Sequence, residues 1–197
     1  MKIGLAQINT TVGDLAGNHR CILSSYRILV QQGAELVVTP ELAITGYPPQ
    51  DLVSKSRFVP LNLAALETLH AEVGKVPLLV GYVDVNHDTG QPFRNAAALL
   101  QRGKPLRKFF KSLLPTYDVF DEDRYFEPNQ DPIVVEIAGI RCGVTICEDI
   151  WTEKYLPRRL YGHEPVRALV AAGAELIINL SASPFTLGKP EGRAEML

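Results

Sequence analysis

Short apolar runs that are typical of strands alternate with helical stretches along most of this chain, and this alternation limits the folds open to it. Some runs are joined by tight polar turns, such as Arg102-Gly103 and Ala138-Gly139, which indicate hairpins. Others are joined through helical stretches such as 18–32, where apolar residues recur on one helical face. A chain with both kinds of connection predicts a layered α/β fold with mixed sheets.

The pattern places most elements by residue range. Strands are expected at residues 2–8, 35–39, 78–85, 96–101, 105–110, 133–137, 141–146 and 175–180. Helices are expected at residues 18–32, 61–73 and 165–172. The final residues, 191–197, read like the beginning of a helix, which indicates a domain that is truncated at its C-terminus.

One short sequence is repeated. Gly33-Ala34-Glu35-Leu36 recurs as Gly173-Ala174-Glu175-Leu176, and each copy ends a helical stretch and opens an apolar strand. The two copies are either ordinary helix–glycine–strand joints or the marks of a pseudo-symmetric pair of sheets, each backed by equivalent helices. The sequence leaves both interpretations open.

Composition argues against several functional classes. The net charge is −2, and the densest basic stretch, 102–111, contains hydrophobic residues throughout, so nucleic-acid binding is not expected. No segment approaches the roughly 18 consecutive apolar residues of a membrane span. The N-terminal stretch is too short and too polar for a signal peptide. Three cysteines without such a signal indicate a reducing compartment, so we expect a cytoplasmic protein.

Two strands lead into loops that carry conspicuous charged groups. Glu41 follows the strand at 35–39 directly after Pro40, and a carboxylate at such a junction can be desolvated and act as a base. It could equally cap its loop or pair with a surface cation. Lys111 lies among phenylalanine and leucine residues, where its amine either extends to solvent or is held partly buried as a functional cation.

Cys147 ends a third apolar strand and precedes Glu148-Asp149, acidic residues suited to a first helical turn. A helix N-terminus would lower the pKa of the thiol, and the backbone N–H groups that follow could bind an oxyanion. The alternative is a buried structural cysteine, which is the interpretation given to Cys21 and Cys142. The chain has no C-x-x-C pair, and an odd spacing places Cys142 and Cys147 on opposite strand faces, so no zinc site is expected.

A cysteine, a glutamate and a lysine can together hydrolyse an amide. The glutamate takes the thiol proton, and the thiolate attacks the carbonyl carbon. The ammonium and a backbone N–H group hold the oxyanion, and the glutamate then protonates the departing ammonia. Spacing along the chain does not prove that the three residues meet.

In this order, the three segments resemble those of the nitrilase, or carbon–nitrogen hydrolase, superfamily. The matching segments are TPELAITGYP around Glu41, FKSLLPTY around Lys111 and TICEDIW around Cys147. The resemblance covers nearly the whole chain, and it implies a four-layer α-β-β-α sandwich with a Glu-Lys-Cys triad. Glu41 would be the general base, Lys111 the cation that stabilises the oxyanion, and Cys147 the nucleophile.

Within the superfamily, four segments are similar to the glutaminase domain of glutamine-dependent NAD synthetases. They are GYPPQDL, LLPTYDVFDEDRYFEP, CEDIW and SASPFTLGK. That resemblance implies a glutamyl thioester on the cysteine, and it makes Glu122 an acidic residue that orients the lysine. Tyr117, Glu148, Trp151 and Ser183 match positions that hold glutamine. The Glu148 carboxylate would suit the α-ammonium, and its backbone N–H would be the second oxyanion donor.

In that family, the ammonia passes to an ATP-dependent domain that amidates nicotinic acid adenine dinucleotide. The chain has no Gly-Gly pair, so the pyrophosphate loop of that domain is absent. Residues 1–197 are therefore interpreted as an incomplete carbon–nitrogen hydrolase (glutaminase) domain, without metal or cofactor of its own. ATP and Mg²⁺ are expected only for the missing synthetase domain.

Expected partners are glutamine, that synthetase domain and further copies of the chain in a homo-oligomer. Three alternatives stay open. The chain could be a stand-alone amidase or nitrilase of the same superfamily, a catalytically relict nitrilase-like interaction domain, or an unrelated α/β protein. What the gene encodes beyond Leu197 would distinguish the first alternative, and the reactivity of the thiol would distinguish the second.

Overall fold

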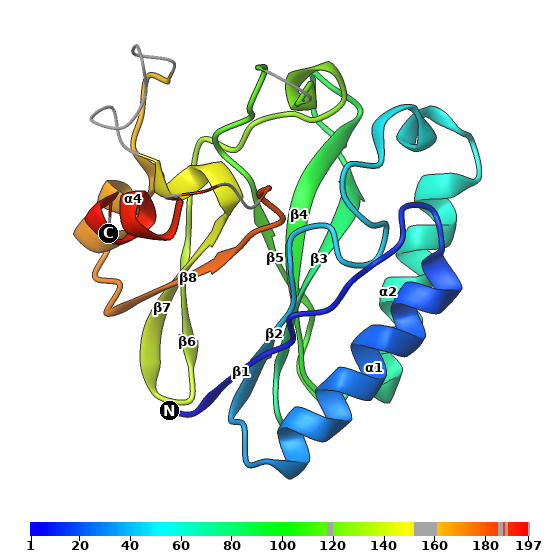
Figure 1. Ribbon diagram of the computed structural model, residues 1–197, viewed down its shortest axis with the longest axis vertical. Helices are drawn as coiled ribbons and strands as arrows, with labels where there is room; N and C mark the ends of the chain where they lie inside the picture. The colour runs from blue at the N-terminus through cyan, green and yellow to red at the C-terminus, as the bar shows by residue number, and fades with distance from the viewer. Residues whose placement is uncertain (118–119, 152–160, 185–186, 188, 197) are drawn as a thin grey trace.

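Two mixed β-sheets pack face to face, with helices on the outer side of each (Figure 1). The computed structural model describes residues 1–117, 120–151, 161–184, 187 and 189–196. Parts of the segments 113–128 and 181–189, which carried the sequence resemblance, lie outside the described residues, as does Leu197. The expected mixed-sheet, four-layer α/β fold is confirmed.

Among the described residues, the first sheet has five strands in the order of the chain. They are β1 (Ile3–Leu5), β2 (Leu36–Val38), β3 (Leu78–Val85), β4 (Phe93–Leu100) and β5 (Arg107–Phe110). The helices α1 (Leu15–Gln31) and α2 (Phe58–Glu72) make the crossovers that parallel neighbours need, so β1, β2 and β3 are parallel. Polar turns join β3 to β4 and β4 to β5, and both pairs are antiparallel.

In the part of the chain that the structure describes, the second sheet consists of β6 (Val134–Ile137), β7 (Ile140–Ile146) and β8 (Leu176–Leu180). The turn Ala138-Gly139 joins β6 to β7, and both of its residues have positive φ angles, as this tight hairpin requires. The helix α3 (Pro165–Ala171) leads into β8, which runs parallel to β7. The helix α4 (Lys189–Met196) follows and agrees with the helix expected near the end of the chain.

Apolar cores separate the layers, and the two largest among the described residues lie on either side of the first sheet. In the outer core, the faces of α1 and α2 pack on the first sheet; its members include Ile22, Tyr26, Leu66, Leu69, Val80 and Tyr82. The inner core lies between the sheets and includes Leu36, Leu79, Phe109, Val144, Ile146, Ile178 and Leu180. Because strands of the first sheet contribute to both cores, they are apolar on both faces, which explains why several read as continuous hydrophobic runs.

The repeated sequence marks equivalent joints, one in each sheet. The N–H of Glu35 donates to the carbonyl of Lys2 at 2.7 Å, and the N–H of Glu175 donates to the carbonyl of Arg141 at 2.7 Å. The glutamate side chain accepts from the N–H of the same neighbour in each case, at 2.6 Å and 3.0 Å. The two joints therefore have the same hydrogen-bond pattern, and the symmetry of the whole sheets stays a prediction.

Several boundaries differ from the sequence prediction. α1 begins at Leu15, earlier than expected, because the Asp14 side chain accepts the N–H of Gly17 at 2.8 Å and caps the helix. β1 is shorter than the expected strand because its partner β2 is equally short. The short 3₁₀ segments η1 (Gln50–Ser54) and η2 (Glu122–Arg124) were not predicted, and η3 (Cys147–Ile150) is a short 3₁₀ segment where the first turn of a helix was expected. In the part of the chain that the structure describes, no helix is long and apolar enough to span a membrane.

Gly81 on β3 lets the loop after β2 approach the sheet closely. Its carbonyl accepts the N–H of Ile44 at 3.1 Å, and its N–H donates to the Thr39 hydroxyl at 3.2 Å. A β-carbon at this position would lie 2.4 Å from the backbone nitrogen of Leu42 and 2.7 Å from the carbonyl oxygen of Pro40. Glu41 lies between those two residues, so this glycine helps to fix the position of its carboxylate.

We predict that Gly81→Ala lowers the free energy of unfolding by about 1–3 kcal/mol, because the methyl group would overlap backbone atoms that have little freedom to move. Urea denaturation followed by circular dichroism measures the change. Gly162→Ala is the control, because a β-carbon at Gly162 meets no atom within 4 Å. Equal unfolding midpoints for Gly81→Ala and the unmodified protein would contradict the prediction.

Candidate active site

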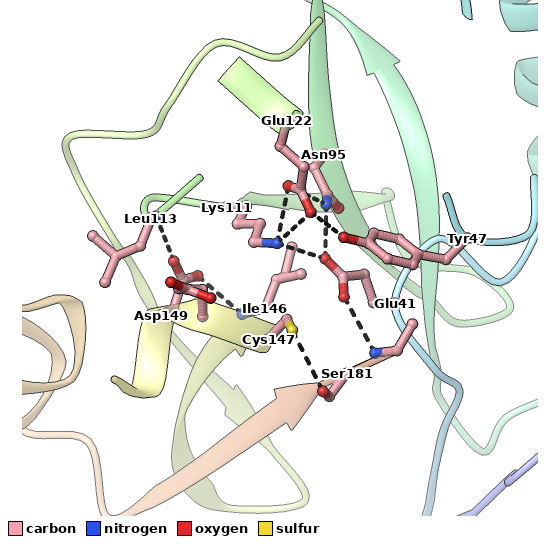
Figure 2. A network of polar contacts seen from close by, with 12 residues as sticks. Glu41, Tyr47, Asn95, Lys111, Leu113, Glu122, Ile146, Cys147, Asp149 and Ser181 are labelled. Atoms are coloured by element: carbon pink, nitrogen blue, oxygen red, sulfur yellow. Dashed lines mark hydrogen bonds and ion pairs between the residues drawn. The ribbon is translucent and has the colours of Figure 1, made fainter. Parts of the chain in front are cut away.

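The segments that follow β2, β5 and β7 bring Glu41, Lys111 and Cys147 together (Figure 2). All three side chains are buried, and those of Glu41 and Lys111 are fully inaccessible to solvent. Lys111 Nζ lies 2.7 Å from Glu41 Oε1. Lys111 therefore does not extend to solvent, and Glu41 pairs with a buried cation rather than a surface one. The structure decides both of these alternatives that the sequence left open.

A second carboxylate completes the buried ion cluster. Glu122, in η2, accepts from Lys111 Nζ at 2.8 Å and 2.9 Å through its two oxygens. Asn95 Nδ2 bridges the carboxylates of Glu41 and Glu122, at 2.8 Å and 3.2 Å, and the Tyr47 hydroxyl donates to Glu122 Oε1 at 2.8 Å. Glu122 therefore contacts the lysine, and its expected role of orienting that lysine stays a prediction. Asn95 and Tyr47 were missed, because neither residue stands out in its local sequence.

The charges of this cluster depend on one another. Burial alone would lower the pKa of Lys111, but the carboxylates of Glu122 and Glu41 raise it well above its usual range, so the amine is an ammonium. Burial raises the pKa of Glu122, the Lys111 ammonium opposes that shift, and the Glu41 carboxylate adds to it. Removing one partner from such a buried ion pair typically costs about 3–5 kcal/mol. Lys111 therefore supports the fold as well as supplying a positive charge.

The segment after β8 contacts both the carboxylate and the thiol. The N–H of Ala182 donates to Glu41 Oε2 at 3.2 Å, so the two oxygens of Glu41 have different partners. The Ser181 hydroxyl lies 3.5 Å from Cys147 Sγ as a donor. Asn179 Nδ2 donates to the carbonyl of Cys147 at 3.3 Å. The end of β8 therefore helps to hold the base and the nucleophile in place.

Cys147 occupies a sharp turn between β7 and η3. Its φ angle is 47°, a left-handed conformation that is unfavourable for a residue with a side chain. The sequence prediction that a helix N-terminus lowers the pKa of this thiol is wrong. The segment is a single 3₁₀ turn, and burial raises the pKa of Cys147 to about 12, with a further increase from Glu41 that Lys111 opposes. The resting thiol is therefore protonated and needs a base.

Glu148 presents a buried carboxylate beside the nucleophile. The Tyr117 hydroxyl donates to its two oxygens at 3.0 Å and 2.8 Å, and the Tyr161 hydroxyl donates to Oε1 at 2.8 Å. Burial, together with the Glu148 carboxylate, raises the pKa of both tyrosines, so both hydroxyls remain neutral donors. Tyr161 was missed by sequence analysis, because nothing in its surrounding sequence points to this contact.

The remaining residues assigned from the sequence lie in the same segments. The N–H of Trp151 donates to the carbonyl of Glu148 at 2.8 Å. Its indole Nε1 is buried without a hydrogen-bond partner among the residues that the structure describes. The N–H of Ser183 donates to the Ser181 hydroxyl at 3.3 Å. The glutamine-binding roles of Trp151 and Ser183 stay predictions. No cluster of metal-ligating side chains occurs within the described ranges.

Comparison with known proteins identifies the family of this chain. The profile of the carbon-nitrogen hydrolase family matches residues 2–196. The chain belongs to the carbon-nitrogen hydrolase family. Its similarity to proteins in this family extends across both sheets and includes all three strand ends that carry Glu41, Lys111 and Cys147.

Curated relatives of this carbon-nitrogen hydrolase include glutamine-dependent NAD(+) synthetases. The Thermotoga maritima protein is 40% identical over 200 residues, which cover 100% of this chain and 32% of the relative. The Synechocystis sp. protein is 39% identical, and the match covers 95% of this chain and 35% of the relative. The chain thus spans about a third of the length of these relatives.

Solved structures of other proteins have the same fold as this chain. A glutamine-dependent NAD+ synthetase from Acinetobacter baumannii superposes with a TM-score of 0.81 at 30% identity, covering 97% of this chain and 34% of that one. An amidase from Nesterenkonia sp. superposes with a TM-score of 0.78 at 23% identity, covering 98% and 68% of the two chains. The amidase shares the fold of this hydrolase.

The raised pKa of Cys147 predicts how the free hydrolase reacts with an alkylating agent. Below a pKa of about 12 the thiol is mostly protonated, so the small thiolate fraction grows about tenfold per pH unit. Iodoacetamide modification of the Cys147 peptide, followed by mass spectrometry, should accelerate steadily between about pH 7 and pH 10. A rate that levels off near pH 8 would instead show that the resting site stabilises the thiolate.

Proposed function

We propose that this hydrolase domain converts glutamine to glutamate and ammonia through a thioester on Cys147. The observation that carries the proposal is the fully buried Glu41–Lys111 pair, 2.7 Å apart, beside a buried and protonated thiol. This combination supplies a base, a fixed positive charge and a nucleophile in one place. The relatives are glutamine-dependent NAD(+) synthetases, which supports glutamine as the substrate.

In the first step, the Glu41 carboxylate takes the proton from Cys147 Sγ, and the sulfur attacks the carbonyl carbon of the side-chain amide. The carbonyl oxygen gains the negative charge. The Lys111 ammonium and the backbone N–H of Glu148 stabilise that oxyanion. A hydrogen-bond donor stabilises an oxyanion most strongly in a buried site like this one. Removal of one such donor typically lowers kcat by roughly 10²–10³-fold.

In the second step, the carbon–nitrogen bond breaks as Glu41 returns its proton to the leaving nitrogen, which departs as ammonia. A γ-glutamyl thioester remains on Cys147. Water then attacks the thioester carbon while Glu41 takes a proton from it. The carbon–sulfur bond breaks, glutamate is released, and Glu41 returns the proton to the sulfur, which restores the starting state.

Glu148 supplies a recognition group for the α-ammonium of glutamine. Its carboxylate belongs to the residue directly after the nucleophile, and it is buried with only 3% of its surface exposed. Two tyrosine hydroxyls hold it, and one of them, that of Tyr117, belongs to a side chain that is 37% exposed. A charged group in this setting favours a substrate that brings its own cation, because pairing offsets the cost of burying the carboxylate.

The proposal extends to the destination of the ammonia. In a longer chain of the kind that the relatives have, the ammonia would pass to an ATP-dependent synthetase domain and amidate nicotinic acid adenine dinucleotide to NAD. That domain, with its ATP and Mg²⁺, would be the main partner of this one. The cytoplasmic location and the homo-oligomer stay predictions from the sequence.

A glutamine-like diazo-ketone electrophile tests the nucleophile and the substrate together. In protein shown to be folded by circular dichroism, we expect one adduct on Cys147, and glutamine should prevent it.

Cys147→Ala should abolish ammonia release from glutamine, whereas Cys21→Ser should leave it unchanged, because Cys21 lies in α1 and takes no part in the site. Equal labelling of all three thiols would refute the proposal. Faster turnover of simple aliphatic amides than of glutamine would favour a stand-alone amidase.

We predict that Glu148→Gln raises the KM for glutamine by at least about tenfold, because it removes a hydrogen bond between charged groups. The variant keeps the size of the side chain. The comparison substrate is 4-carbamoylbutanoate, which is glutamine without its α-ammonium, and its KM should not change. Steady-state ammonia release measures both substrates. An equal rise in KM for the two would show that Glu148 does not recognise the α-ammonium.

A further inference from the structure

Asp149 is a buried carboxylate that contacts neither Glu41 nor Lys111 by a hydrogen bond in the described network (Figure 2). Its Oδ1 accepts from the backbone N–H groups of Ser112 and Leu113, at 2.9 Å and 2.8 Å. Its Oδ2 accepts from the backbone N–H of Ile146 at 2.9 Å. One side chain therefore satisfies three backbone donors that belong to two separate segments.

These donors flank the two residues that must act on the same carbonyl group. Ser112 directly follows Lys111 at the end of β5, and Ile146 directly precedes Cys147 at the end of β7. The two strands belong to different sheets. We propose that Asp149 is a positioning residue that fixes Lys111 relative to Cys147, so that the oxyanion created by attack of the thiol forms within reach of the ammonium.

A local capping role does not account for this arrangement. The bond to Ile146 is a local contact at the start of η3, but the bonds to Ser112 and Leu113 join residues 37 and 36 positions apart in the chain. Apolar packing between the sheets fixes their separation, yet it has no directional preference. Hydrogen bonds are directional and resist sliding of one strand end past the other.

Burying the charged carboxylate of Asp149 costs free energy. Burial raises the pKa of Asp149 to about 6, although the three N–H groups and Lys111 act to lower it. Cys147 also holds a left-handed φ angle of 47°, a strained conformation that persists only where surrounding contacts impose it. The bond from Ile146 to Asp149 lies immediately before that strained residue and helps to impose its conformation.

Asp149→Asn and Asp149→Ala test the inference, which rests on the proposed glutamine hydrolysis. Asparagine keeps one acceptor oxygen but places an NH₂ group against one of the backbone donors, and alanine removes all three bonds. We expect kcat per folded molecule to fall by roughly 10²-fold for both variants, with KM for glutamine unchanged, because the displaced groups act on the transition state. Circular dichroism and urea denaturation give the folded fraction.

The matched control is Asp84→Asn, another buried carboxylate that accepts a backbone N–H, from Val85 at 3.0 Å. Asp84 also bonds Tyr82, a member of the helix-facing core, and pairs with Lys108 at 2.8 Å, so its loss should lower stability without changing kcat per folded molecule. If Asp149→Asn likewise lowers only the unfolding midpoint, the positioning role is overturned.

A second readout separates this inference from the proposed function. If the unmodified protein releases no ammonia from glutamine, the glutaminase proposal fails, and the alkylation rate of Cys147 by iodoacetamide decides the role of Asp149. If Asp149 is a positioning residue, Cys147 should be alkylated faster in Asp149→Asn than in Asp84→Asn. The reason is that the turn that buries the thiol loses hydrogen bonds that hold it in place. Equal rates in the two variants would overturn it.

Discussion

The ammonium of Lys111, buried between the carboxylates of Glu41 and Glu122, is the interaction on which the rest of the site depends. Three charges out of contact with water are tolerated only when each has partners, and this requirement explains the neutral donors around them. Asn95 and Tyr47 donate further hydrogen bonds to the carboxylate oxygens that Lys111 also contacts. Burial raises the pKa of the neighbouring Cys147 thiol, and the Glu41 carboxylate raises it further, so the resting thiol is protonated.

Much of the fold could be predicted because local signals and tertiary structure agree. The hairpin at Ala138-Gly139 and the strand at 78–85 were predicted correctly, since turn chemistry and hydrophobic runs determine them locally. Boundaries that depend on partners were less accurate. β1 is limited by the length of β2, and α1 begins where the Asp14 side chain caps it. Neither effect can be seen in the local sequence.

Sequence analysis found the reactive residues that directly follow a predicted strand. It missed the residues whose contacts form only when distant segments of the chain come together. Glu41, Lys111 and Cys147 were found because each follows an apolar run, and the family resemblance joined them. The pKa of Cys147 was predicted in the wrong direction, because burial outweighs the short 3₁₀ turn after it. Asn95, Tyr161 and the contacts of Asp149 were missed, because they join residues that are distant along the chain.

The proposed base and cation follow strands of one sheet, whereas the thiol follows a strand of the other. Their spacing is therefore a property of the interface between the sheets, not of any single loop. A change of side-chain volume in the inner core, at Leu79 or Ile178 for example, would therefore reach the site, because a close-packed interior transmits strain from one sheet to the other. The geometry of the site in this sandwich therefore depends on how closely its two sheets pack against each other.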